Sequence, residues 1–237
     1  MVEIGRGATL SAMARLVLFT IAEEPMHPDV DSGAEHASLT DEAGAIVVVA
    51  ASAGGIAAIS ELLRALPADL PAAIALVQHR SATPKSILAE ILQRTSRMPT
   101  RTALEGERIQ RGVVYIAPAD MHLTITKQRR FHLVGGLRIC HTLSSANPLF
   151  DSASRAFGGR VLAIVLTGGD SDGTDGVQSV ASAGGVVIAQ DPTTAFAPAM
   201  PSSAIGTGAV AQVLPLADIA PAIVGIVGAW ARETSCA

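Results

Sequence analysis

The strongest constraint on the fold of this chain is an alternation of continuously apolar runs with segments of helical spacing. No polar residue occurs in three of the runs, which are Ile46–Ala50, Ala73–Val77 and Val161–Leu166. Such runs are typical of strands buried on both faces, because both sides of the strand then need apolar side chains. After the first run, apolar residues recur at helical intervals, at Ile56, Ile59, Leu62, Leu63 and Leu66. The alternation predicts βαβ units and therefore an α/β fold with three layers and a doubly wound, mostly parallel sheet.

The remaining elements are shorter. Strands are expected at 113–118, 123–126, 131–134, 137–140, 186–189 and 209–214, and some of the first four pair as a hairpin insertion. Helices are expected from Pro84, over 148–157, over 174–183, from Met200, and over 219–230 with Asp218 as the N-cap.

Composition and charge exclude several classes of protein. The chain has 237 residues, of which 49% are hydrophobic and 16% charged, and its formal net charge is −4. A chain of this kind is neither disordered nor a highly charged nucleic-acid binder. Aromatic residues make up only 3%, which argues against base-stacking surfaces. The only cysteines, Cys140 and Cys236, form no CxxC pair, so no disulfide framework or cysteine zinc site is expected and the predicted location is the cytoplasm.

The N-terminal part lacks the rhythm of the rest. The apolar stretch Ala8–Ala22 is interrupted by Arg15 and is too short to span a membrane, so no membrane insertion is expected. Residues 27–44 are polar and turn-prone, which is typical of a linker. We therefore expect a poorly ordered extension over 1–44, with Met1 or Met26 as the start, and one domain over 45–233.

Three polar residue types follow the three apolar strands. Ser52 comes after the first strand and His79 after the second, and a loop with Asp170 and Asp172 follows the third. In a parallel sheet the carboxyl ends of the strands meet at one edge, where ligands bind. A serine hydroxyl is a weak nucleophile unless an imidazole takes its proton and a carboxylate orients that imidazole. The placement therefore predicts a Ser-His-Asp site.

Each of these signals also has a structural interpretation. Ser52 precedes Ala53-Gly54-Gly55 and could serve as a helix N-cap or as part of a phosphate-binding turn, although the spacing matches neither GxGxxG nor GK[ST]. The turn also lacks the GxSxG pattern of α/β-hydrolases. The acidic, glycine-rich loop 168–176 does not fit the EF-hand spacing. The other histidines are scattered, so no metal site and no cofactor are expected.

Several motifs in order are similar to one known family. They are AASAGG at 50–55, VQHR at 77–80, VVYIAPADMHL at 113–123, LTGGDSDGTDGV at 166–177, AQDP at 189–192 and MPSSAI at 200–205. From Ile46 to the final helix, the chain resembles the CheB-type protein-glutamate methylesterase family. Agreement of several motifs in the same order is far more specific than any single motif.

The resemblance implies an esterase that removes methyl groups from glutamate γ-methyl esters on methyl-accepting chemoreceptors, and it also allows deamidation of receptor glutamines. The family's catalytic residues correspond to Ser52, His79 and Asp172. Candidates for stabilising the oxyanion are the turn residues Ala53 and Gly54, which open a helix, and Gly169 in the loop.

The chain departs from the family's pattern near the site. The family commonly has glycine at the position of Ala50 and often threonine at that of Ala53, and its methionine before the aspartate corresponds to Gly169. Asp170 occupies a position where the family often has glycine. We expect its extra negative charge to raise the pKa of His79.

A second departure concerns regulation. Members that act in chemotaxis usually carry an N-terminal receiver domain, and residues 1–45 are too few to form one. The expectation is a stand-alone catalytic domain that is regulated by a partner in trans or by its extension. Two further hypotheses stay open: a non-catalytic CheB-like interaction module in a sensory assembly, and a phosphate-ligand-binding domain that uses the SAGG turn.

Overall fold

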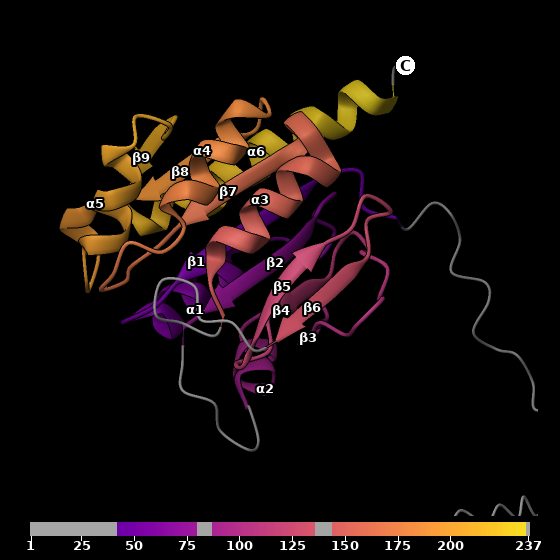
Figure 1. Cartoon of the computed structure of the whole chain (residues 1–237), viewed down its shortest axis with the longest axis horizontal. Coiled ribbons are helices and arrows are strands. Elements are labelled where there is room, and N and C mark those ends of the chain that lie inside the picture. Colours follow the sequence, from indigo (N-terminus) through magenta and orange to yellow (C-terminus); the bar gives the residue numbers. More distant parts are fainter. Residues whose placement is uncertain (1–41, 80–86, 136–143, 236–237) are drawn as a thin grey trace, which may run out of the picture. The chain divides into compact units, whose positions relative to one another are not determined.

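A computed structural model of the chain describes residues 42–79, 87–135 and 144–235 (Figure 1). The described residues belong to one compact unit. The predicted extension up to residue 41, the strand expected at 137–140 and the start of the helix expected from Pro84 lie outside them.

Seven strands in the described residues form one sheet. They are β1 (Ile46–Ala51), β2 (Ala73–Gln78), β3 (Thr100–Thr102), β4 (Val114–Ile116), β7 (Val161–Val165), β8 (Val186–Gln190) and β9 (Gln212–Leu214). Their order is β3-β4-β2-β1-β7-β8-β9, and every neighbouring pair is parallel. The predicted α/β fold with a mostly parallel sheet is confirmed.

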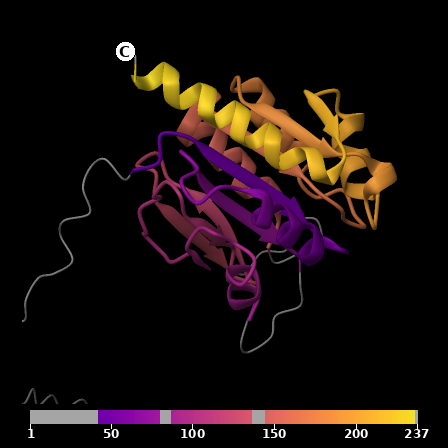
Figure 2. The ribbon, with the colours of Figure 1, turned by 180° about the vertical axis from the view of Figure 1, so that it is seen from behind.

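Helices cover both faces of this sheet. Figure 2 shows the long helix α6 (Leu216–Ser235) across one face, where α1 (Gly55–Ala65) and α2 (Leu88–Gln93) also pack. The other face carries α3 (Ala146–Phe157) and α4 (Thr174–Ser182), which lie side by side in Figure 1.

The two cores on either side of the sheet follow from strand periodicity. Side chains of β1 alternate, so that Ile46, Val48 and Ala50 join the core under α3 and α4. Val47, Val49 and Ala51 join the core under α1 and α6. Because successive side chains of a strand point to opposite faces, a run without polar residues fills both cores at once.

The hairpin insertion consists of β5 (Met121–Ile125) and β6 (Phe131–Gly135), which pair antiparallel. It packs against α3. The predicted hairpin is confirmed, and it brings His122 of β5, which is 1% exposed, toward the N-terminus of α3.

Three predicted details differ from the structure. Asp218 lies in the first turn of α6, which begins two residues earlier at Leu216, so the predicted N-cap is wrong. A carboxylate in the first turn still interacts favourably with the helix dipole. Strand β9 begins at Gln212 rather than at 209, and the helix α5 (Ala199–Gly206) precedes it. The edge strand β3 was not predicted, because its three residues Thr-Arg-Thr carry no apolar run.

The strand order reverses between β1 and β7, and loops at the carboxyl ends of these strands are where doubly wound folds bind ligands. The register places Ala51 beside Gln78 and Ala50 beside Val165, so the ends of β1, β2 and β7 coincide. Of the helices in the described segments, none is long and apolar enough to cross a membrane.

Candidate active site

Ser52 is the first residue after β1 and lies in a tight turn that leads into α1. Its backbone N–H donates to the carbonyl of Thr167, two residues past the end of β7, over 2.9 Å, and its carbonyl accepts from Gly55 N at 2.9 Å. Gly54, at the N-cap of α1, has a φ of 77°, which is costly for any residue with a Cβ. Gly54 of the SAGG sequence is therefore needed for the turn that presents Ser52.

Gln78, the buried last residue of β2, connects the serine turn to the histidine. Its Nε2 donates to the carbonyl of Ser52 at 2.8 Å and to that of His79 at 3.0 Å. The side chain packs so closely on Gly55 that a Cβ there would lie 2.1 Å from Gln78 Oε1. Gln78 lies in the VQHR motif but was not among the predicted site residues; its position at the end of a buried strand was the available signal.

His79 follows Gln78 and contacts two carboxylates. Its Nε2 lies 2.7 Å from Asp172 Oδ2, and its Nδ1 lies 3.1 Å from Asp170 Oδ2. The side chain of His79 is 9% exposed, that of Asp172 is fully buried and that of Asp170 is 37% exposed. Both acidic residues of the loop after β7 therefore contact the same ring, one from the interior and the other from the partly exposed side.

The carboxylate of Asp172 is held by further donors. Its Oδ2 accepts from the backbone N–H of Ala146 at 2.6 Å, and its Oδ1 accepts from Ser145 Oγ. Ser145 is the N-cap of α3, and its own backbone N–H donates to Nδ1 of buried His122 at 3.1 Å. Ser145 was not among the predicted site residues, because nothing local to residue 145 indicates a partner 27 positions away.

The two carboxylates dominate the protonation of His79. Burial alone would lower the pKa of the imidazole, but the hydrogen bonds and charges of Asp170 and Asp172 outweigh burial and raise the pKa to about 9. The hydrogen bond with His79 in turn lowers the pKa of Asp170. The extra charge of Asp170 thus acts in the direction expected from the sequence, and at neutral pH the ring is an imidazolium between two carboxylates.

Only one of the two hydrogen bonds expected within the predicted triad is formed in this structure. His79 and Asp172 are in contact, but among the described residues no hydrogen bond connects Ser52 Oγ to the His79 ring. Ser52 lies against the loop after β7, because a Cβ on Gly168 would be 3.0 Å from the Ser52 Cβ. The assignment of Ser52, His79 and Asp172 as a catalytic triad stays a prediction.

The three predicted oxyanion donors lie on two loops of this edge. Ala53 and Gly54 are exposed residues of the serine turn, and Gly169 is exposed in the loop after β7. Their backbone N–H groups donate to no other residue in the part of the chain that the structure describes. An N–H group without a protein acceptor can receive a ligand oxygen.

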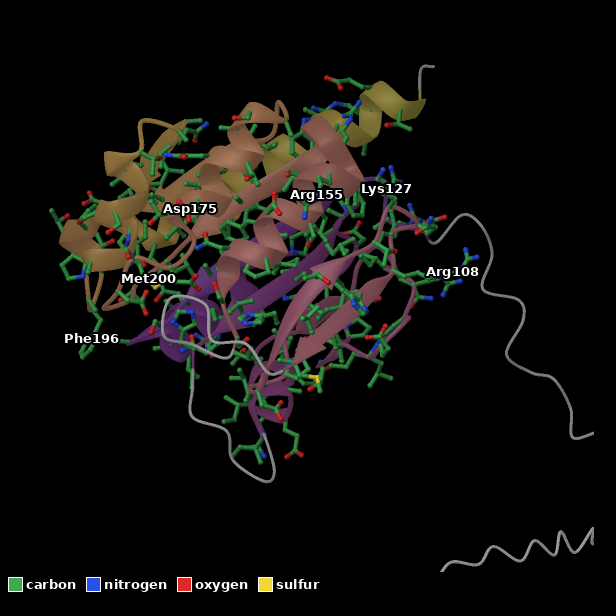
Figure 3. All side chains as sticks on the ribbon, in the orientation of Figure 1. Arg108, Lys127, Arg155, Asp175, Phe196 and Met200 are labelled. Atoms are coloured by element: carbon green, nitrogen blue, oxygen red, sulfur yellow. The ribbon has the colours of Figure 1, made fainter. Side chains whose placement is uncertain are left out.

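An apolar side chain borders the serine turn. Phe196 is 83% exposed, and it lies so close to Gly54 that a Cβ there would be 2.7 Å from the Phe196 Cβ. The side chain of Met200 in α5 packs against Gly168, and its backbone N–H donates to the Gly168 carbonyl. Figure 3 labels both side chains at the same end of the molecule. In the segments described, no group of three or more His, Cys, Asp or Glu side chains is arranged to hold a metal ion.

Comparison with known proteins gives one consistent family. The family model of the CheB methylesterase matches residues 47–223. The chain is 40% identical to a Caulobacter vibrioides protein, "Protein-glutamate methylesterase/protein-glutamine glutaminase 2", over 78% of this chain and 55% of that protein. It is 36% identical to a "Putative protein-glutamate methylesterase/protein-glutamine glutaminase" of Leptospira interrogans, over 73% of this chain and 90% of that protein.

A solved structure agrees with these relatives. The crystal structure of the Thermotoga maritima CheB methylesterase catalytic domain superimposes with a TM-score of 0.75 and 34% identity, over 77% of this chain and 98% of that one. The chain spans about half the length of several of the curated relatives it matches. The matched region, residues 47–223, includes Ser52, His79 and Asp172.

Proposed function

The chain belongs to the CheB methylesterase family, and on that premise we propose that it is a carboxylic ester hydrolase acting on glutamate γ-methyl esters of a protein. The observation that carries this proposal is the contact between His79 and fully buried Asp172, next to the turn of Ser52 at the switch point of the sheet. A base, an orienting carboxylate and a hydroxyl at one edge are the groups that ester hydrolysis needs.

In the first half of the reaction, Ser52 Oγ attacks the ester carbonyl and its proton passes to the ring of His79. The negative charge that develops on the carbonyl oxygen is received by backbone N–H groups of Ala53, Gly54 and Gly169. The intermediate then collapses, the bond to the methoxy group breaks, and the imidazolium returns the proton so that methanol leaves. The product is a glutamyl ester of Ser52.

In the second half, water replaces methanol. His79 takes a proton from the water as it attacks the glutamyl ester, and it returns a proton to Ser52 Oγ when that bond breaks. Asp172 keeps the ring oriented and stabilises its charged form without becoming protonated itself. The three hydrogen bonds that Asp172 Oδ1 and Oδ2 accept from Ser145, Ala146 and His79 make its orientation rigid.

The substrate we propose is a methyl-accepting chemoreceptor in the cytoplasm. The same chemistry extends to deamidation of receptor glutamines, because attack on a primary amide gives the same glutamyl intermediate and releases ammonia. The relatives' names include both activities. We further propose that the catalytic domain covers residues 45–233, with residues 1–44 as an extension, and that a partner in trans regulates it. Residues 42 and 43 already contact the domain, since Glu42 bridges Gln110 and Ala43 is buried.

Methanol release from methylated receptor fragments tests the activity. Ser52→Ala should reduce it by about 10⁶-fold, because no other group supplies the nucleophile. The double variant Ser52→Ala/His79→Ala should be about as slow as Ser52→Ala, since the two residues act as one unit. Assays should extend from pH 6 to pH 10, because His79 titrates near pH 9.

The outcome separates the enzyme from an interaction module. If the wild type releases no more methanol than Ser52→Ala at any pH in this range, on any methylated fragment, the protein is not a methylesterase. Binding of the same fragments without hydrolysis would then favour the non-catalytic module.

A further inference from the structure

The contact between His79 and Asp170 has a consequence for the reaction proposed above, and the inference rests on that reaction. We propose that Asp170 is a positioning residue that occupies the base nitrogen of His79, so that the ring serves Ser52 only after the Asp170 carboxylate has moved away. The chain thus contains a second acidic residue that competes with the nucleophile for the ring.

The imidazole of His79 has two ring nitrogens that can form hydrogen bonds. Each ring nitrogen has one in-plane position, which either donates its proton or accepts one. Asp170 and Asp172 are carboxylates, which only accept when ionised, and they take both nitrogens of His79, at 3.1 and 2.7 Å. Both nitrogens can donate at once only in the imidazolium. A ring in this state has neither a lone pair nor a free in-plane position for Ser52 Oγ.

The two carboxylates are not equally able to leave. Asp172 is fully buried, and its oxygens also accept from Ser145 Oγ and Ala146 N. Removing it would leave these donors unpaired in the interior, which is costly. The side chain of Asp170 is 37% exposed, and its other described contact is a local one from Asp172 N to Oδ1. Water can therefore replace its bond to His79 more readily than it could replace the contacts of Asp172.

This difference between the two carboxylates identifies which nitrogen of His79 acts as the base. When Asp170 withdraws, the Nδ1–H···Oδ2 bond breaks and the Nδ1 proton passes to solvent. The neutral ring keeps its Nε2–H on Asp172 and now has a lone pair on Nδ1. That lone pair can accept the Ser52 hydroxyl proton. Nδ1 is therefore the nitrogen for which Asp170 and Ser52 compete.

The charged groups that act on His79 among the described residues are Asp170 and Asp172, both from the loop after β7. The described backbone contacts of His79 are with uncharged groups: its N–H donates to the carbonyl of Ala51 in β1, and its carbonyl accepts from Gln78 Nε2 in β2. A change at Asp170 alone should therefore be visible in the titration of the ring.

The test compares Asp170→Asn with a matched control. Asparagine has the same shape, and its Oδ1 can still accept from Asp172 N, but it carries no charge. The control is Asp175→Asn, which removes the same charge from an exposed residue in the first turn of α4, labelled in Figure 3. Asp175 makes no described contact with His79. Both variants and the wild type are assayed as the full chain, for methanol release from methylated receptor fragments and for His79 titration by imidazole NMR.

In Asp170→Asn we expect the acidic limb of the kcat/KM profile to move to lower pH, and the NMR titration of His79 to move with it. The value of kcat/KM at pH 7.5 should rise about tenfold for each pKa unit by which the ring titration falls. At pH 10 the variant and the wild type should converge, and Asp175→Asn should follow the wild type throughout.

Two results would overturn the inference. One is a His79 titration in Asp170→Asn that coincides with those of the wild type and Asp175→Asn. The other is a loss of kcat/KM in Asp170→Asn at every pH, which would make Asp170 the orienting acid. If no variant hydrolyses the esters, the proposed function fails, but the NMR titration still decides whether Asp170 holds the ring.

Discussion

The two sides of the His79 ring differ in how firmly they are built. On one side, an inner wall consisting of Asp172, Ser145 and Ala146 is buried at the N-terminus of α3, and each oxygen of the Asp172 carboxylate has a donor. On the other side, the outer rim, Gly169 to Ser171, is a loop in which Asp170 makes one partly exposed contact with the ring. Asp170 and Asp172, which are separated by one residue, thus differ in how firmly their carboxylates are held in place.

Burial and the number of hydrogen bonds, rather than residue type, assign the different roles of Asp170 and Asp172. A carboxylate with three donors in the interior cannot rotate without leaving buried groups unpaired, so it is suited to hold a catalytic ring in one orientation. A carboxylate at the surface exchanges its partner for water at little cost, so it is suited to a contact that is made and broken.

The largest effect should come from the inner wall. Asp172→Asn should lower kcat/KM by about 10⁴-fold, because an amide cannot accept all three donors and no longer stabilises the imidazolium. Methanol release measures the loss, and thermal melting of the variant shows whether the fold survives. If Asp170→Asn is more damaging than Asp172→Asn, the roles of the two aspartates are reversed.

A smaller effect is expected from the support of the inner wall. Ser145→Ala removes the donor to Asp172 Oδ1 and the N-cap acceptor for Asn147 N. We expect the free energy of unfolding to fall by about 2–4 kcal/mol. Ser171→Ala, on the exposed outer rim, is the matched control and should change it by less than about 0.5 kcal/mol. Urea denaturation measures both, and equal losses would mean that the two sides do not differ in rigidity.

The smallest effect should appear in the pH dependence of stability. The pKa of His79 in the folded protein, about 9, lies above its usual value of 6.5. The folded state therefore binds the proton more tightly, and the stability this gives is complete below pH 6.5 and lost as the pH rises through 9. Asp170→Asn should reduce this loss by an amount on the order of 1 kcal/mol, since solvent screens the exposed carboxylate.

Thermal or urea unfolding of the wild type and of Asp170→Asn at pH 6 and pH 10 measures the difference. Two parallel curves of stability against pH would show that Asp170 contributes nothing to the binding of the ring proton.

The sequence alone determined the architecture and the edge at which the site lies. Continuous apolar runs indicate strands that are buried on both faces, so the parallel sheet and the positions of Ser52, His79 and Asp172 after its strands follow from local pattern. The hairpin and the direction in which Asp170 changes the pKa of His79 were also predictable. The three-residue strand β3 was not, because its Thr-Arg-Thr sequence has no apolar run and its partner β4 decides it.

Only the tertiary structure decided which groups touch the ring and how firmly. The contacts of His79 with Asp170 and Asp172 join residues 91 and 93 positions apart, and Ser145 reaches Asp172 across 27. No local pattern encodes such distances, because they depend on the strand register and on where α3 packs. Burial is likewise a property of the assembled layers, so the sequence could place two aspartates in one loop but could not tell which of them is enclosed.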